Sequence, residues 1–316
     1  MRDTSIDILR SIAIICIVIA HTIQNKIALQ IRNFDVPLMV FLSGYCYTAL
    51  KDRYFKYLWK RFIRLVVPTW IFLTVYIAVI FISGDTIGRR DIFEYYLFQT
   101  NWYIWIIRIF CIIAVLSPVL VKAGDAIGKT GFCLVSILSI CAISFLKDLS
   151  GYRVFQYSLA AVPYCLFFYF GFLSKTISPK GMGWISLTAG LMFCAMACFL
   201  GYTRHEFVPT QLYKYPPQLY YVSYATACIG ILFILRQTIT RALERIRLAK
   251  FFSFIGSHTL WMYFYHIFLL FALENVPING FLRFLSVFLG ALLLTWIHSL
   301  VFGSIPNKTV KMIFIG

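Results

Sequence analysis

Residues 8–20 read ILRSIAIICIVIA, and His21 follows directly. The run is apolar enough for a membrane helix, yet it holds a cation, Arg10, and ends at an imidazole. An α-helix turns about 100° per residue, so positions eleven apart return to nearly the same face. Five residues share that face: Asp7, Arg10, Ile14, Ile17 and His21. Such a stripe indicates a functional cavity, or else an Arg10 that extends to the membrane surface and a His21 bonded to a neighbouring helix.

The composition places the chain in a membrane. Hydrophobic residues make up 61%, charged residues 13%, and the mean hydropathy is +0.82. Soluble domains carry about 25% charged residues, so the composition predicts a polytopic membrane protein. The net charge of +17 does not indicate nucleic-acid binding, because the basic residues lie between apolar runs, where lipid contacts and topology explain them.

We therefore expect an all-α fold with about ten transmembrane helices and a single domain over residues 1–316. The first of these helices is expected to be an uncleaved span rather than a signal peptide. Residues 52–64 and 237–252 are basic and amphipathic, and we expect them to lie along the membrane surface. The expected spans are 8–27, 36–51, 65–83, 102–121, 131–147, 157–174, 184–201, 218–236, 254–273 and 281–303.

The basic residues predict the orientation. With the N-terminus in the cytoplasm, the inside segments hold 19 Lys and Arg residues and the outside segments hold 9. This bias predicts that both termini are cytoplasmic, in a plasma (inner) membrane. The nine cysteines all lie in apolar runs without a C-x-x-C spacing, so we expect no disulfide framework and no metal site.

His21 is the leading catalytic candidate. Apolar surroundings favour a neutral imidazole, which is the form that a general base needs. Arg10, nearer the cytoplasm, either meets a phosphate or pairs with Asp7 three residues before it.

Arg61 and Arg64 form an R-x-x-R pair shortly before Pro68, where the third expected span begins. Residues three apart share a helix face, so two guanidinium groups can present a fork to one polyanion. The alternative is that both residues only anchor the span at the cytoplasmic surface.

Other polar residues near or within spans are candidates for substrate binding. Asp35 can orient a histidine or a substrate hydroxyl, although Asp before a Pro-containing segment is also a common turn former. Arg108 lies inside the fourth expected span near Trp102 and Trp105, where it either packs on the rings or lines a polar cavity. His266 is a second imidazole in an apolar run, for which interhelix packing is an equally valid interpretation.

The segment 202–221, YTRHEFVPTQLYKYPPQLYY, is expected outside the membrane. Its Tyr and Pro content is typical of a surface on which sugars stack, and equally of an aromatic belt at the membrane interface.

Several of these motifs together resemble the acyltransferase 3 family of membrane proteins. The family typically opens with an Asp, a basic residue shortly after it and a His eleven positions later, which Asp7, Arg10 and His21 match. Further matching segments follow in the same order, although Met39-Val40-Phe41 departs from the usual Phe-rich core: FDVPLMVFLSGY at 34–45, Arg61-x-x-Arg64 with Pro68, WYIW at 102–105 and LWMYFYH at 260–266.

The resemblance implies a membrane O-acetyltransferase of the stand-alone sugar or exopolysaccharide type. It implies acetyl-CoA as a cytoplasmic donor and a lipid-linked or surface glycan as the acceptor, with no metal and no nucleic acid. In that scheme Arg61 and Arg64 hold the CoA phosphates, and His21 takes the acceptor proton. Two alternatives remain: a transporter of a small solute or lipid-linked sugar, and an accessory structural membrane protein. The sequence does not indicate the oligomeric state.

Overall fold

A computed structural model describes residues 3–48, 54–100, 102–146 and 153–315. Over these residues the fold is all-α, as expected, with one isolated β-bridge between Lys214 and Pro217. Contacts divide the chain into two compact units. Unit 1 comprises Met1–Thr48 and Leu116–Gly256, and unit 2 comprises Ala49–Val115 and Ser257–Gly316.

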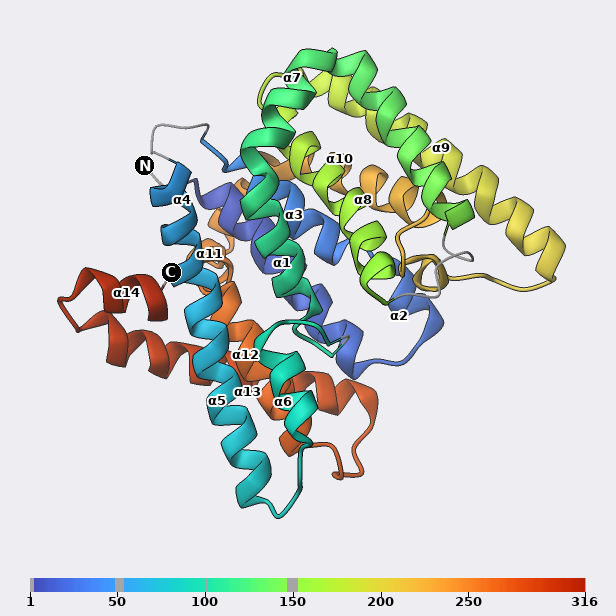
Figure 1. The fold of residues 1–316 in the computed structure, drawn as a ribbon. Coiled ribbons are helices and arrows are strands. Elements are labelled where there is room, and N and C mark those ends of the chain that lie inside the picture. Colours follow the sequence, from blue (N-terminus) through green and yellow to red (C-terminus); the bar gives the residue numbers. More distant parts are fainter. Residues whose placement is uncertain (1–2, 49–53, 101, 147–152, 316) are drawn as a thin grey trace. The chain divides into compact units, whose positions relative to one another are not determined.

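Unit 1 is built around α1, which packs against α3 and α10 (Figure 1). α9 lies along α10, and α8 lies along α3. α7 begins in unit 2 and continues into unit 1. The helices with residues in unit 1 are α1 (Thr4–Thr22), α2 (Lys26–Ile31), α3 (Asp35–Tyr45), α7 (Trp105–Leu146), α8 (Arg153–Leu173), α9 (Pro179–Arg204), η2 (Thr210–Tyr213), α10 (Leu219–Arg245) and α11 (Ala249–Ser257).

The predicted stripe of α1 faces the interior of unit 1. The helix begins where Asp3 accepts a hydrogen bond from the Ser5 backbone N–H, a common N-cap. Asp7, Ile14 and Ile17 on the stripe are buried, while Arg10 and His21 are partly exposed.

α3 and α8 approach each other at two glycines. A Cβ atom at Gly44 would lie 1.8 Å from the Phe168 carbonyl oxygen, and one at Gly171 would lie 1.9 Å from the Phe41 carbonyl oxygen. Small residues let membrane helices come this close. α3 and α8 are therefore in backbone contact at Gly44 and Gly171.

Unit 2 packs α12 against α13 and α5, with α14 against η1 and α13. His298 links three of these segments. Its Nδ1 lies 2.8 Å from the Tyr265 hydroxyl and its Nε2 lies 2.8 Å from the Phe314 carbonyl oxygen. Besides its part of α7, the unit holds α4 (Tyr54–Arg61), η1 (Phe62–Val66), α5 (Val67–Ile82), α6 (Arg89–Tyr96), α12 (Thr259–Ala272), α13 (Gly280–Gly303) and α14 (Lys308–Phe314).

The expectation of ten spans is too high. Over the described residues, six helices are long and apolar enough to cross a membrane, or seven if α11 and α12, bent by 80°, form one broken span. α3 has 11 residues, too few to cross the hydrocarbon region. The 42 residues of α7 count as one of these six helices, although Gly128 (φ 68°, ψ 175°) divides α7 into two helical segments that match the spans expected at 102–121 and 131–147. The apolar part of α8, Leu159–Leu173, is also short.

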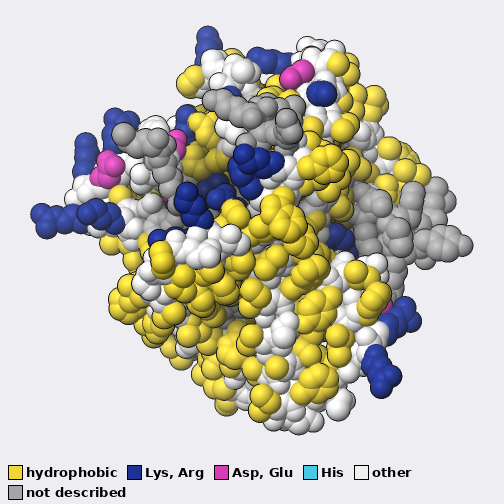
Figure 2. Space-filling model, turned by 60° about the vertical axis from the view of Figure 1, so that its left-hand side comes forward, with side chains coloured by type: hydrophobic (Ala, Val, Ile, Leu, Met, Phe, Trp, Pro, Cys, Tyr) yellow, Lys and Arg dark blue, Asp and Glu magenta, His cyan; other side chains and the backbone are white. Residues whose placement is uncertain are grey.

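The two expected surface helices have different outcomes. α4 exposes Phe55 and Trp59, but it continues without a break through η1 into α5, so Tyr54–Ile82 forms one candidate span and the surface position expected for 52–64 stays a prediction. Residues 237–252 do not form one surface helix, because α10 continues without interruption to Arg245 and α11 then begins at Ala249. Hydrophobic side chains cover much of the face shown in Figure 2, as a membrane-embedded surface requires.

Candidate functional site

Asp7 and Arg10 form an ion pair near the start of α1. Arg10 Nη1 lies 3.2 Å from Asp7 Oδ1, and Asp7 is buried while Arg10 is partly exposed. Arg10 Nη2 also donates to Cys46 Sγ at 3.4 Å, at the end of α3. Of the interpretations considered for Arg10, the geometry therefore shows the ion pair with Asp7.

His21 lies in the last turn of the same helix, partly exposed. Eleven residues at 1.5 Å each put it about 17 Å along the axis from Arg10, so the stripe holds two separate polar sites. The charges of Asp35, Arg32 and Lys214 all act on the His21 imidazole. His21 therefore belongs with a charged cluster of unit 1, and not with the Asp7–Arg10 pair.

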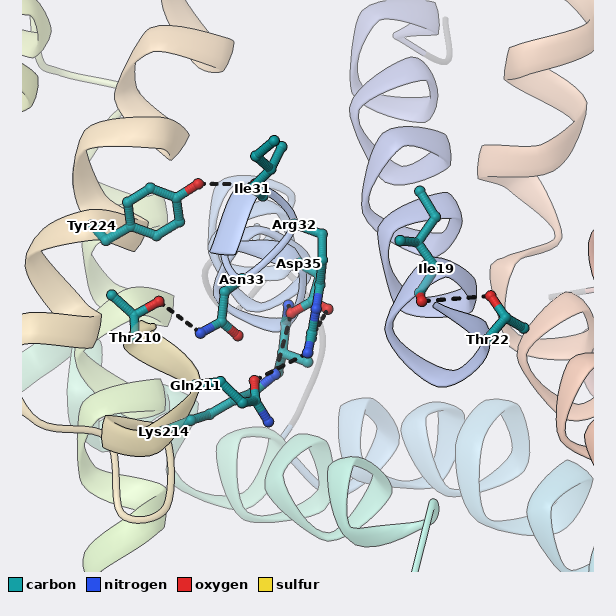
Figure 3. Close-up of polar contacts among 11 residues, drawn as sticks. Ile19, Thr22, Ile31, Arg32, Asn33, Asp35, Thr210, Gln211, Lys214 and Tyr224 are labelled. Carbon is teal, nitrogen blue, oxygen red and sulfur yellow. Dashed lines mark hydrogen bonds and ion pairs between the residues drawn. The ribbon is translucent and has the colours of Figure 1, made fainter. Parts of the chain in front are cut away.

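That cluster consists of one carboxylate and two cations. Asp35 Oδ2 accepts a hydrogen bond from Arg32 Nη1 at 2.9 Å, and Asp35 Oδ1 accepts one from Lys214 Nζ at 3.4 Å. The side chains are nearly inaccessible: 5% of Arg32, 1% of Asp35 and 3% of Lys214 is exposed. Figure 3 shows the three side chains converging: Arg32 lies in the turn before α3, Asp35 begins α3, and Lys214 directly follows η2. We call these residues the 32/35/214 cluster.

Neutral side chains fasten the same two segments together. Arg32 Nη2 donates to Gln211 Oε1 at 3.0 Å, and Asn33 Nδ2 donates to Thr210 Oγ1 at 2.9 Å (Figure 3). Gln30 Oε1 accepts from the Thr210 backbone N–H at 2.8 Å. The polar network therefore joins residues about 180 positions apart into one buried structure beside α1.

Burial and charge oppose each other within the cluster. Burial alone would raise the pKa of the Asp35 carboxyl, but Lys214 and Arg32 outweigh it and hold that pKa below its usual value. Burial lowers the pKa of Lys214 to about 8, and the Asp35 carboxylate limits this decrease. Asp35 is consequently anionic at neutral pH, and Lys214 changes charge under mildly alkaline conditions.

Sequence reasoning finds Asp35 but misses its two partners. Nothing local in the sequence distinguishes a buried cation such as Arg32 or Lys214 from an exposed one. The available signal is the presence of polar residues in both 30–35 and 210–214. Their pairing depends on the fold, since 179 residues separate Lys214 from Asp35.

In unit 2, the R-x-x-R pair adopts a different local structure from the expected one. Arg61 ends α4, while Arg64 lies in the π-helix η1, whose wider turn changes the angle between positions three apart. The Arg61 guanidinium carbon lies 5.3 Å from the centroid of the Tyr57 ring. Arg64 is exposed, and the positive charge of Arg61 acts on it. Short π-helical segments occur often at functional sites.

Trp102 and His266 belong to one aromatic cluster of unit 2. The Trp102 ring centroid lies 5.1 Å from that of Tyr103, and the Tyr103 centroid lies 6.5 Å from that of His266. The Tyr263 hydroxyl donates to the Tyr103 carbonyl oxygen, which fixes the cluster between α12 and the start of α7. His266 is fully buried within it.

Arg108 contributes to the same unit in another way. Its Nη1 donates to the Phe98 carbonyl oxygen at 2.8 Å, which anchors the connection before α7. The structure thus groups the expected site residues by unit. Asp7, Arg10, His21 and Asp35 lie in unit 1, while the remaining ones, Arg61, Arg64, Trp102, Arg108 and His266, lie in unit 2.

Comparison with known proteins supplies an independent observation. The family model of the acyltransferase domain, acyltransferase family 3, matches residues 3–300. The chain is 28% identical over 235 residues to nodulation protein NolL of Sinorhizobium fredii (strain NBRC 101917 / NGR234). The match covers 67% of this chain and 60% of NolL, so the chain spans less than two thirds of that relative. No solved structure matches the chain.

Proposed function

From the premise that this chain is an acyltransferase of the acyltransferase 3 family, we propose that it transfers acetyl groups from cytoplasmic acetyl-CoA to a glycan. The acceptor is a hydroxyl group of a lipid-linked or surface glycan, and the protein lies in the plasma (inner) membrane. The family assignment favours this function over a transporter or an accessory membrane protein.

The observation that carries the proposal is the position of His21. His21 lies at the C-terminal end of the stripe on α1 and is partly exposed. The charges of the 32/35/214 cluster act on its imidazole. A general base needs both access to a substrate proton and surroundings that fix its orientation and charge. Among the five histidines, His266 is fully buried and His298 bonds through both ring nitrogens to its neighbours.

One general base, His21, is sufficient for the proton transfers of this reaction. The acceptor hydroxyl oxygen forms a bond to the acetyl carbonyl carbon as His21 takes the hydroxyl proton. The bond between that carbon and the CoA sulfur then breaks, and the proton passes from His21 to the departing thiolate. The products are the O-acetylated glycan and CoA. General-base catalysis contributes about 10²–10⁴-fold, so positioning of the two substrates supplies much of the remaining acceleration.

In this proposal, arginine side chains expected near the cytoplasmic side bind or position the acyl donor, acetyl-CoA. Arg61 and Arg64 hold the phosphates of CoA, for which guanidinium groups are suited by charge and geometry. Asp7 and Arg10, tied to each other by their ion pair, position the start of α1 or the donor. Asp35, Trp102, Arg108 and His266 are proposed to contribute to the acceptor site.

The direct test is chemical analysis of the surface glycan. Mass spectrometry of glycan from cells with and without the protein should show an added mass of one acetyl group per modified sugar in the former sample. The purified protein in detergent, given acetyl-CoA labelled in the acetyl group, should move the label to the same glycan. An unlabelled glycan and identical spectra would refute the proposal.

A further inference from the structure

The 32/35/214 cluster carries more positive than negative charge. Within the described part of the chain, Asp35 is the carboxylate that pairs with Arg32 and with Lys214, so two buried cations share one anion. Removing an ion from water costs several kcal/mol unless an opposite charge compensates it. A group with one further negative charge would balance the cluster.

The cations also have hydrogen-bond donors to spare. A lysine ammonium has three donors, and Lys214 donates to the Asp35 carboxylate at 3.4 Å. An arginine guanidinium has five, of which Arg32 uses one toward Asp35 and one toward Gln211. Arg32 Nε is buried and has no hydrogen-bond partner among the described residues. These donors can contact an anion without displacing Asp35.

Two tyrosine rings lie near Lys214. Lys214 Nζ lies 5.8 Å from the ring centroid of Tyr215 and 5.9 Å from that of Tyr221. Tyr215 is 56% exposed, although Lys214 next to it is buried. Lys214 and Tyr215 both follow η2 in the connection between α9 and α10. A ring beside a cation suits a sugar that carries an anionic group.

We propose that Arg32 and Lys214 bind an anionic group of the acceptor, a phosphate or a carboxylate, and thereby direct an acceptor hydroxyl toward His21. This inference rests on the proposed function, because it assigns the acceptor class of the same site. A lipid-linked sugar supplies a phosphate, and a uronic acid in a glycan supplies a carboxylate. The cluster recognises the charge that the two have in common.

The test measures binding rather than acetyl transfer. Thermal unfolding of the purified protein in detergent is followed with glucose 1-phosphate, with methyl glucuronide and with neutral methyl glucoside, all at equal ionic strength. A ligand that binds the folded state raises the unfolding temperature. We expect one or both anionic sugars to stabilise the protein and the neutral sugar to have no effect. The sugar that stabilises identifies phosphate or carboxylate as the preferred group.

Variants assign the effect to the cluster. Lys214→Met leaves Arg32 and Asp35 as a neutral pair, so it should fold, and it should raise the dissociation constant of the anionic sugar by about ten- to a hundredfold. Lys214→Arg keeps the charge and should retain binding. Lys26→Met removes an exposed cation of the same unit, paired with Glu206, and should bind like the unchanged protein.

Each result has a distinct meaning. Equal stabilisation by the neutral sugar, no stabilisation by either anion, or unchanged binding in Lys214→Met would each overturn the anion site. If Lys214→Met fails to fold, the Lys214→Arg variant provides the test instead. It retains the positive charge, so loss of anion binding in that variant would also refute the site. Acetyl transfer without anion binding would refute this inference while leaving the proposed function intact. Anion binding without acetyl transfer would refute the proposed function instead.

Discussion

Gly256 lies directly against the backbone of Asp7, so closely that a Cβ atom at position 256 would be 1.7 Å from the Asp7 carbonyl oxygen. The contact brings the end of α11 against the first turn of α1 within unit 1. Because the opposing atom belongs to the backbone, it cannot rotate away as a side chain can. The backbone of Asp7, whose side chain pairs with Arg10, therefore packs against position 256. Only glycine fits at that position without a shift of the backbone.

Gly256→Ala should consequently displace the start of α1. Overpacking of this kind costs about 1–3 kcal/mol, which should lower the unfolding temperature by several degrees and reduce acyl transfer. The matched control is Gly183→Ala in α9, where an added Cβ meets nothing within 4 Å. Thermal melts of both purified variants check the prediction, and equal unfolding temperatures would contradict it.

His21→Ala should abolish acyl transfer while the protein still inserts and folds. The imidazole is the base that accepts the acceptor proton in the proposed reaction, and alanine offers no replacement. His205→Ala is the control, because His205 is an exposed histidine at the end of α9 in the same unit. Expression, melting behaviour and transfer of labelled acetyl are measured for both. Normal transfer by a well-expressed His21→Ala protein would remove His21 from the mechanism.

The sequence predicts the parts of the site that depend on one helix. The spacing of Asp7, Arg10 and His21 places these three residues on one face of α1, because helical periodicity is local. The same reasoning cannot pair Lys214 with Asp35, since that contact depends on how distant segments pack. Hydropathy likewise identifies apolar runs but not where helices join or stop. For this reason residues 36–51 are expected as a full span, whereas α3 has only 11 residues.

Both termini are predicted to lie in the cytoplasm. The expected inside segments hold 19 basic residues against 9 outside, and Lys and Arg near spans favour the cytoplasmic side. A reporter that is active only in the cytoplasm should be active when fused after Gly316, and a reporter active only outside should be silent there. The opposite pattern would reverse the topology and place Arg61 and Arg64 away from cytoplasmic CoA.

Arg61→Ala and Arg64→Ala should weaken donor binding more than acceptor binding. Hydrogen bonds to charged groups are worth about 1.5–3 kcal/mol each, so each loss should raise the apparent acetyl-CoA constant by about ten- to a hundredfold. Lysine at either position should rescue only partly, because it supplies charge without the guanidinium fork.

Arg89→Ala serves as the control for this pair, since Arg89 is an exposed cation of the same unit. Titration of the purified variants with acetyl-CoA distinguishes between the two roles considered for Arg61 and Arg64, binding of the CoA phosphates and anchoring of the helix at the membrane surface. Full rescue by lysine would identify Arg61 and Arg64 as surface anchors. An unchanged donor constant in both alanine variants would place the CoA site elsewhere.

Binding of the anionic sugar should weaken above about pH 8. Burial lowers the pKa of Lys214 to about 8, so its charge is present below that pH and is lost above it. Each further pH unit should then raise the dissociation constant by up to tenfold, toward the value of Lys214→Met. Arginine keeps its charge throughout this range, so Lys214→Arg should bind with little change from pH 7 to pH 9.5.

The same shift predicts how stability depends on pH. The folded-state pKa of Lys214 lies below the ordinary lysine value of about 10.4, so between these two values the unfolded chain binds more protons. The contribution of Lys214 to the free energy of unfolding should therefore rise as the pH increases from about 8 to 10.4.

Other groups near Lys214 also carry or change charge: Asp35, Arg32, His21, Tyr215 and Tyr221. Comparison with Lys214→Arg isolates the contribution of Lys214, because these groups are common to both proteins. The difference between the two binding profiles should have its midpoint near pH 8. Superimposable profiles for the lysine and arginine proteins would show that position 214 does not govern anion binding.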